Sequence, residues 1–178
     1  GYRDVIACDQ ACFTNTAATA GTALTAEHLV SLSDITSSVT LAFDGDEGGR
    51  LAVSRVAELD VDHPLRLRVA HLPPGQDPAD LLRQGGDGFE QALADAVPIE
   101  HHLIADAVGR YNLNEPEGVA RAVHHAGRVV AAINDPADRD RALAYLAARV
   151  DLREELIHDV LTEQAPGRVR GPASRGLA

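Results

Sequence analysis

The 178-residue sequence contains no lysine, methionine or tryptophan, and aromatic residues make up only 3% of it. All 16 basic residues are therefore arginines, whereas Asp and Glu together number 27, which gives a formal net charge of −11. This balance argues against a basic nucleic-acid-binding module that acts alone. Apolar residues make up 45% of the chain, so Ala, Leu and Val must form the core of one large domain or two small ones.

Further absences narrow the class of protein. No apolar run reaches membrane-spanning length, and no signal peptide is visible. Because the chain has no methionine, we expect Gly1 to lie inside a longer protein. The two cysteines, Cys8 and Cys12, are predicted to share one helix face, and no further pair of zinc ligands is placed nearby. These features favour a reduced, intracellular protein without a zinc site.

The most informative stretch runs from residue 39 to residue 59. Residues 39–43 are apolar and predict a buried strand, and apolar residues at helical spacing over 51–59 predict a helix. Asp44 and Asp46 lie between them, at the carboxyl end of the strand, where open α/β sheets bind ligands. Gly45 allows a tight turn there.

Two interpretations of these carboxylates stay open. Alternate residues of an extended segment point the same way, so Asp44 and Asp46 can converge on a hard cation such as Mg²⁺ or Mn²⁺. Alternatively, Asp44 caps the following helix and Asp46 occupies its first turn, where the helix dipole favours acidic side chains.

The segments before this stretch predict two short helices and one weak strand. Residues 4–12 predict the first helix, and the small residues 16–19 predict the strand, which residues 21–22 break. Thr25 is a good N-cap for a helix over 27–32.

The segments after it predict one more strand and then helices alone. Residues 65–72 alternate between apolar and polar, which predicts a half-buried strand near a sheet edge with Arg66 and Arg68 on its solvent side. Asp77 before Pro78 predicts the start of a short helix. Beyond a glycine-rich break, apolar periodicity predicts helices over 89–97, 99–111, 119–133, 139–150 and 154–163.

These patterns predict an α/β fold, an open sheet with crossover helices, followed by an all-α subdomain. We expect a metal-binding catalytic domain at residues 1–84, with one strand lost before Gly1, and a helical subdomain at 85–164. Residues 165–178 carry too little apolar surface to fold and are predicted to form a tail or linker.

Four stretches match one family in order: residues 1–5, 20–25, 43–50 and 72–82. Together they resemble the catalytic core of bacterial DnaG-type primases from the TOPRIM domain onward. The D-x-D of the third stretch is shared by all TOPRIM proteins, whereas the second and fourth stretches favour primases. The resemblance covers about residues 1–163, because the helical second half is also similar to the family's helical subdomain, and it implies a TOPRIM-like sheet.

The resemblance implies a metal site and a reaction. Asp44 and Asp46 would hold the divalent metals, Mg²⁺ or Mn²⁺, that bind the incoming nucleoside triphosphate, and Asp4 and Asp77 match further acids of that site. The implied activity is DNA-directed synthesis of short RNA primers by two-metal nucleotidyl transfer, in which one ion activates the attacking 3′-hydroxyl.

The resemblance also implies partners and a location. The partners would be a single-stranded DNA template, ribonucleoside triphosphates and the replicative helicase, the last through a region beyond this chain, with no membrane involved. The protein would work in the bacterial cytoplasm, in the nucleoid at the replication fork.

The sequence departs from the family pattern in three places. The family's catalytic glutamate immediately precedes the Gly-Tyr pair, so we expect it upstream of Gly1 and expect residues 1–178 alone not to polymerise. The family often has a second acid two residues after Asp77, where this chain has Ala79, and Asp80 is a candidate substitute. Arg3 replaces a residue that is usually apolar or small, which we interpret as neutral surface variation.

Other candidate residues have two interpretations each. Arg50 could bind a phosphate through its guanidinium fork or form an ion pair with Glu47 or Asp46. The adjacent histidines at 101–102 and 124–125 point about 100° apart on a helix, which disfavours a shared metal and predicts solvated side chains. His71 is predicted to be structural.

Two other functions stay open. A TOPRIM nuclease or topoisomerase-type enzyme would use the same D-x-D, but Tyr2, Tyr111 and Tyr145 lie in no recognisable nucleophile context. A non-catalytic interaction module would use the acidic turn only as a helix cap, so that Asp44→Asn and Asp46→Asn would leave a metal titration unchanged.

Overall fold

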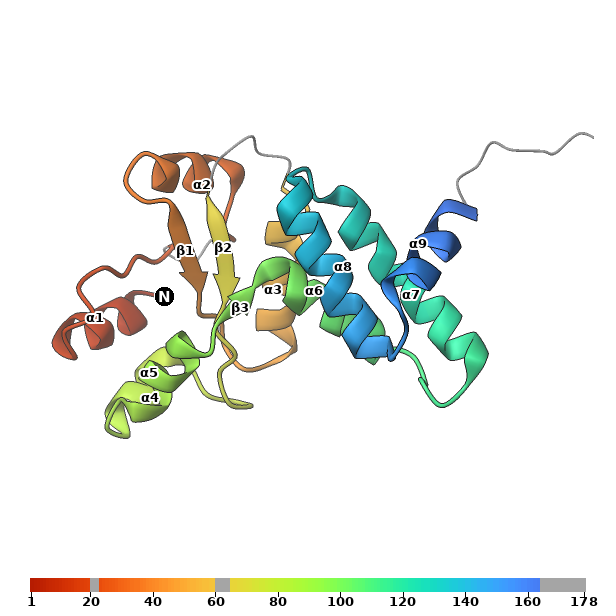
Figure 1. Cartoon of the computed structure of the whole chain (residues 1–178). Coiled ribbons are helices and arrows are strands. Elements are labelled where there is room, and N and C mark those ends of the chain that lie inside the picture. The colour runs from red at the N-terminus through yellow and green to blue at the C-terminus, as the bar shows by residue number, and fades with distance from the viewer. Residues whose placement is uncertain (20–22, 60–64, 164–178) are drawn as a thin grey trace, which may run out of the picture. The chain divides into compact units, whose positions relative to one another are not determined.

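The computed structural model describes residues 1–19, 23–59 and 65–163, and the chain divides into two compact units (Figure 1). The first unit comprises residues 1–103 and the second begins at Ile104. An α/β unit followed by helices confirms the predicted fold class. The predicted domain boundaries stay predictions. Two predicted features lie outside the described residues: the break at 21–22 and the tail at 165–178.

Within its described residues, the first unit contains helices and three short strands. In chain order they are α1 (Tyr2–Gln10), α2 (Ala26–Ser33), β1 (Ser38–Leu41), α3 (Glu47–Ala57), β2 (Arg66–Val69), α4 (Pro78–Arg83), α5 (Asp87–Ala94) and β3 (Val97–Pro98). Helix α6 (Ile99–Gly109) follows directly. The predicted Thr25 cap of α2 is confirmed, since the Thr25 side chain accepts a hydrogen bond from the backbone N–H of His28.

The described sheet has the order β1-β2-β3. Strands β1 and β2 run parallel, with Leu41 opposite Val69, and α3 lies between them in sequence as a crossover. Strand β3 is antiparallel to β2, with Val97 opposite Val69, so the prediction that β2 lies near an edge was wrong for the described sheet. The sequence pattern assigned Val97 to a helix, but a residue before proline favours extended backbone, which leaves Val97 free to pair with β2.

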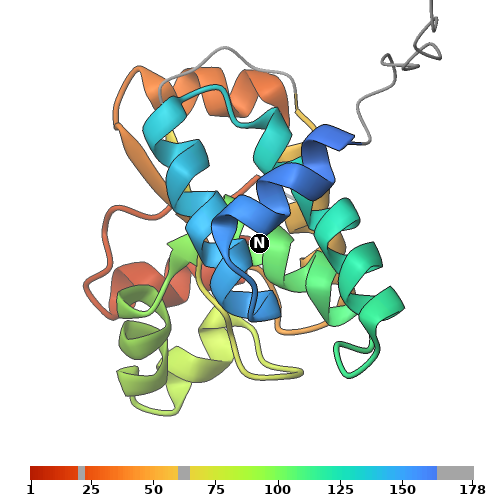
Figure 2. The same cartoon turned by 45° about the vertical axis from the view of Figure 1, so that its right-hand side comes forward.

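Helices cover both faces of this sheet. One buried cluster joins α2, α3 and the strands through Leu29, Leu41, Val53, Val56, Leu65, Val69 and Ile99. A second joins α1, α4 and α5 through Cys8, Ala70, Leu72, Leu81, Phe89, Ala92 and Ala96. Figures 1 and 2 show α1 beside α4 and α5, away from α2. Because α1 packs against α4, residues from the start of the chain reach the loop after β2.

The predicted strand over residues 16–19 was wrong. The Thr16 hydroxyl donates a hydrogen bond to the backbone oxygen of Phe13 at 2.9 Å, which closes a turn instead, and the Phe13 ring packs edge-on against Phe89. Cys8 and Cys12 do not share a helix face either. Helix α1 ends at Gln10, and Cys12 is exposed with a positive φ of 68°, whereas Cys8 is buried.

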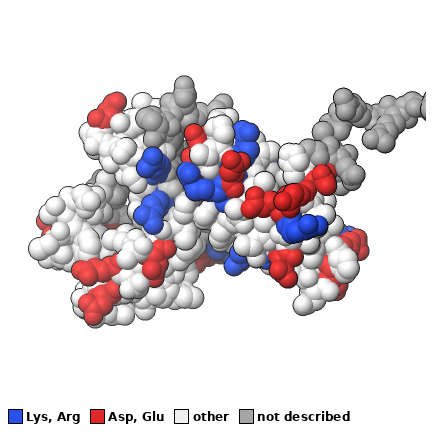
Figure 3. Space-filling view, viewed as in Figure 1, with Lys and Arg blue, Asp and Glu red and all other residues white. Residues whose placement is uncertain are grey.

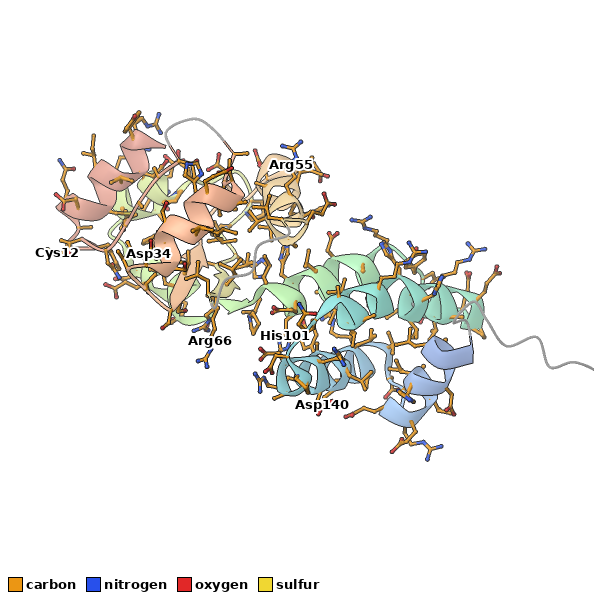
Figure 4. All side chains as sticks on the ribbon, turned by 90° about the horizontal axis from the view of Figure 1, so that it is seen from above. Cys12, Asp34, Arg55, Arg66, His101 and Asp140 are labelled. Atoms are coloured by element: carbon orange, nitrogen blue, oxygen red, sulfur yellow. The ribbon has the colours of Figure 1, made fainter. Side chains whose placement is uncertain are left out.

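Strand β2 carries two exposed arginines, as predicted. Arg66 projects away from the ribbon in Figure 4, and Arg68 donates a hydrogen bond to the backbone oxygen of Ala96. On the face seen in Figure 3, basic side chains gather over the strands, whereas acidic side chains gather over α4 and α5. This face therefore presents charges of both signs and not one continuous basic track.

The second unit is helical, as predicted. It contains the end of α6 together with α7 (Pro116–Ala132), α8 (Pro136–Val150) and α9 (Glu154–Glu163). Helix α7 packs against both α8 and α9, and the core is aliphatic, with Ile104, Leu146 and Ile157 fully buried. Among the described residues, no helix has the length and apolar character needed to cross a membrane.

Two of the histidines predicted to be solvated are not. His102 is only 8% exposed, and its ring lies 5.0 Å from the ring of His71, centroid to centroid. His125 is half-buried, with Nδ1 3.3 Å from the Tyr111 hydroxyl. Adjacent positions on a helix diverge by about 100°, so one member of each pair turns inward when the other faces solvent.

The half-buried His125 makes the stability of the chain sensitive to acid. Burial lowers the pKa of His125, and the nearby guanidinium groups of Arg110 and Arg128 lower that pKa further. The unfolded chain therefore binds this proton more readily, so stability should fall as the pH drops below about 6.5. We expect the Tm to depend less on pH between about 7.5 and 5.5 in His125→Gln than in the unsubstituted chain.

The exposed neighbour His124 offers the matched control for that measurement. The charge of His124 is the smallest of the influences that lower the pKa of His125, so His124→Gln should change the pH dependence of the Tm less than His125→Gln does. An equal reduction in both variants would show that His125 has no special role in it.

Candidate metal centre

The predicted acidic residues gather where two parallel strands end. The arrowheads of β1 and β2 point the same way in Figure 1, so the loops that follow them meet at one edge of the sheet. Asp44 and Asp46 lie in the loop after β1, and Asp77 ends the loop after β2. This is the edge at which open α/β sheets bind ligands.

Gly45 joins the two loops. Its N–H donates to the backbone oxygen of Gln76 at 3.1 Å, and its own backbone oxygen accepts from the N–H of Gly75 at 3.1 Å. A Cβ at position 45 would lie 2.1 Å from the backbone oxygen of Pro73 and 2.8 Å from that of Leu72. A glycine is therefore required by the close approach of the second loop, which brings Asp44 and Asp77 to one place.

Asp46 caps helix α3. Its Oδ1 accepts a hydrogen bond from the backbone N–H of Gly49 at 2.8 Å. One of the two carboxylates therefore caps the following helix, as the capping interpretation predicted. That interpretation assigned the cap to Asp44, which was wrong. A Cβ on Gly49 would lie 2.1 Å from the backbone oxygen of Asp44, so the first turn of α3 packs directly on the acidic loop.

Asp77 caps helix α4, as the Asp-Pro pair predicted. Its Oδ1 accepts from the backbone N–H of Asp80 at 2.7 Å, and its Oδ2 accepts from Nη2 of Arg3 at 3.1 Å. Asp80 lies on the same capping box, where its Oδ2 reaches the backbone N–H of Asp77 at 3.5 Å and its Oδ1 pairs with Arg83. Asp80 as a metal ligand in place of Ala79, which is buried, stays a prediction.

Asp4 comes from the first turn of α1. Its side chain is 19% exposed and accepts a hydrogen bond from the amino group of Gly1. Arg3, beside it, reaches Asp77 on α4. The first helix thus places one carboxylate and one guanidinium next to the two acidic loops.

The electrostatics show that these carboxylates are close enough to interact. Asp44 keeps an exposed surface, yet partial burial of its carboxyl raises the pKa of Asp44 above its ordinary value. The negative charges of Asp46, Asp4 and Asp77 raise that pKa further, and the amino group of Gly1 lowers it. Three carboxylates, from three separate segments, therefore oppose the ionisation of Asp44, and a cation would relieve that repulsion.

The chemistry of this donor set fits a hard divalent cation. Carboxylate oxygens are the ligands that Mg²⁺ and Mn²⁺ prefer. The buried Oε1 of Gln76, the residue before Asp77, has no hydrogen-bond partner among the described residues. In the described part of the chain, no group of three His, Cys, Asp or Glu side chains is arranged so that it could hold a metal ion. Asp46 and Asp77 are held instead by their helix caps.

The remaining candidate, Arg50, forms an ion pair. Its Nη2 lies 3.3 Å from Oε2 of Glu47 on the exposed first turn of α3. A phosphate contact by Arg50 stays a prediction. Arg3, interpreted from the sequence as neutral surface variation, pairs with Asp77 in the fold, and that contact was not predicted. For Arg3, the available signal was a basic side chain beside an acid in a strongly acidic chain.

Comparison with known proteins shows which family the chain resembles. The family model described as Toprim-like matches residues 1–82, and the model described as the DnaB-helicase binding domain of primase matches residues 101–155. A DNA primase of Streptomyces coelicolor is 32% identical over 158 residues, which cover 85% of this chain and 25% of that protein. The chain belongs to the bacterial DnaG-type primase family.

Solved structures of this family have the same fold. The RNA polymerase domain of Mycobacterium tuberculosis primase DnaG, in complex with double-stranded DNA, aligns with a TM-score of 0.74 at 32% identity, over 86% of this chain and 50% of that one. A DnaG primase catalytic domain bound to single-stranded DNA aligns with a TM-score of 0.74 at 28% identity, over 88% and 51%. The likeness confirms the predicted TOPRIM-like fold.

The similarity covers only part of each matched protein. The chain spans about a quarter of the length of the curated relatives it matches and about half of the matched solved chains. The helicase-binding match lies at residues 101–155, inside this chain, whereas sequence analysis placed the helicase contact beyond it.

Proposed function

We propose that the protein containing this chain is a DNA-directed RNA polymerase that synthesises short RNA primers, and that residues 1–103 supply its metal-binding site. The observation that carries the proposal is the position of Asp44 at the carboxyl ends of two parallel strands, where partial burial and then the charges of three other carboxylates raise its pKa. Membership of the primase family supports the reaction class.

The residues present suggest a division of roles. Asp44, whose ionisation the other three carboxylates oppose, would be the principal ligand, and Asp4 from α1 and Asp77 from the cap of α4 would complete the shell. Asp46 would contribute Oδ2, because its Oδ1 already caps α3. Bound Mg²⁺ or Mn²⁺ would activate a primer 3′-hydroxyl and neutralise charge on the departing pyrophosphate.

The proposed partners follow from the same family membership. They are a single-stranded DNA template, ribonucleoside triphosphates and the replicative helicase. The match at residues 101–155 supports helicase contact through the helical region of this chain. The protein would then act in the bacterial cytoplasm at the replication fork.

Incorporation of labelled ribonucleotides on single-stranded DNA tests the proposal. The parent protein should incorporate label only when Mg²⁺ or Mn²⁺ is present, and residues 1–178 alone should not. Metal-dependent nicking of DNA without incorporation would favour the TOPRIM nuclease instead. If neither reaction occurs and Asp44→Asn leaves Mn²⁺ binding unchanged, the acidic turn serves only as a helix cap.

A further inference from the structure

Both carboxylate oxygens of Asp77 are already engaged. Oδ1 accepts the capping hydrogen bond from the backbone of Asp80 at 2.7 Å, and Oδ2 accepts from Nη2 of Arg3 at 3.1 Å. Arg3 lies on α1, which packs against α4, so this ion pair joins two of the elements that build the site. A cation that binds Asp77 through Oδ2 would share that oxygen with the guanidinium, whose positive charge opposes a second cation at the same place.

The two partners of this ion pair differ in their freedom to move. The Asp77 side chain is 23% exposed and is fixed by its cap, whereas the Arg3 side chain is 75% exposed. An exposed arginine loses little when its ion pair breaks, because water rehydrates the guanidinium. Arg3 is therefore the partner that can leave while Asp77 stays in place.

We propose that Arg3 is a positioning residue that acts as an exchangeable counter-ion for Asp77. In the metal-free protein it neutralises Asp77 and holds α1 on α4, and it competes with the divalent cation for Oδ2. This inference rests on the proposed function, because it requires a cation among Asp44, Asp4 and Asp77. It assigns to Arg3 an effect on metal affinity that neutral surface variation would not have.

Titration of the 178-residue chain with Mn²⁺, with free Mn²⁺ measured by electron paramagnetic resonance, tests the inference. At low salt, Arg3→Gln should tighten Mn²⁺ binding by about three- to fivefold, the range expected when one exposed ion pair no longer competes. The gain should shrink at about 0.5 M salt, where exposed charges are screened. In an Asp77→Asn background, Arg3→Gln should change nothing, because the competing oxygen has lost its charge.

Arg121 offers the matched control. Its side chain is 65% exposed and pairs with Glu117 within α7, so Arg121→Gln removes the same charge without touching Asp77 or another candidate ligand. The inference is wrong if Arg121→Gln tightens binding as much as Arg3→Gln, or if Arg3→Gln leaves binding unchanged or weaker. The proposed metal site would still stand in those cases if Asp44→Asn abolishes binding. Absence of Mn²⁺ binding in every variant would overturn both.

Discussion

Replacing Asp44 with asparagine should reduce ribonucleotide incorporation by the parent protein by about 10³-fold. Asp44 lies at the centre of four interacting carboxylates, and an amide in its place removes the charge that attracts the cation. A metal contributes several kcal/mol to transition-state stabilisation, and each ~1.4 kcal/mol changes the rate tenfold. Incorporation assays at saturating Mg²⁺ would measure the loss.

The same substitution should stabilise the metal-free chain. The pKa of Asp44 is raised in the folded state, so the fold holds this proton more tightly than the unfolded chain does. The stabilising contribution is present below the ordinary pKa and is lost as the pH rises through the raised value. At neutral pH the ionised carboxylate therefore opposes folding, and Asp44→Asn should raise the Tm while it abolishes Mn²⁺ binding.

A matched substitution separates the site from general charge effects. Asp34 is exposed at the end of α2 in the same unit and is labelled in Figure 4. Asp34→Asn also removes one negative charge but should leave Mn²⁺ binding and incorporation unchanged. Full activity of Asp44→Asn, or equal losses in the two variants, would contradict the assignment of Asp44 as a ligand.

Gly45→Ala should be the most destabilising single-methyl change in the acidic loop. The new Cβ would stand 2.1 Å from the backbone oxygen of Pro73, and both loops would have to move apart because neither contact is a flexible side chain. Overpacking of this kind costs up to about 3 kcal/mol, occasionally more. For a unit of this size we expect the Tm to fall by more than about 10 °C, and Mn²⁺ binding should weaken as Asp77 separates from Asp44.

Gly109 supplies the control for this prediction. It ends α6, and a Cβ there would meet no atom within 4 Å. Gly109→Ala should therefore leave the Tm unchanged or raise it slightly, since alanine favours helix more than glycine does. A Gly45→Ala variant as stable as Gly109→Ala would show that the two loops are not held together as described.

Local patterns in the sequence were sufficient for most of the secondary structure. The helices of the second unit follow from apolar periodicity, because that signal acts within a few residues. The same holds for the cap of α4 by Asp77. The candidate ligands Asp44 and Asp46 were identified from a strand followed directly by two carboxylates and a helix.

Longer-range pairing was not visible in those patterns. The inward turn of His102 depends on a packing partner elsewhere in the fold, and the two-residue strand β3 is too short to show a period of its own. The cap of α3 could not be assigned from local patterns for the same reason. By sequence, either Asp44 or Asp46 could cap this helix. In the fold, Gly49 packs against the backbone of Asp44, and Asp46 is the residue that caps.

The sequence by itself determined the α/β order of elements, the helical second half and the carboxylates that could bind a metal, because each depends on neighbours in the chain. Only the tertiary structure decided that Asp4, Asp44 and Asp77 interact and that Arg3 pairs with Asp77, 74 positions away. Those contacts arise because parallel strands end at one edge and α1 packs on α4. The concentration of negative charge at the candidate site thus arises only when the chain folds.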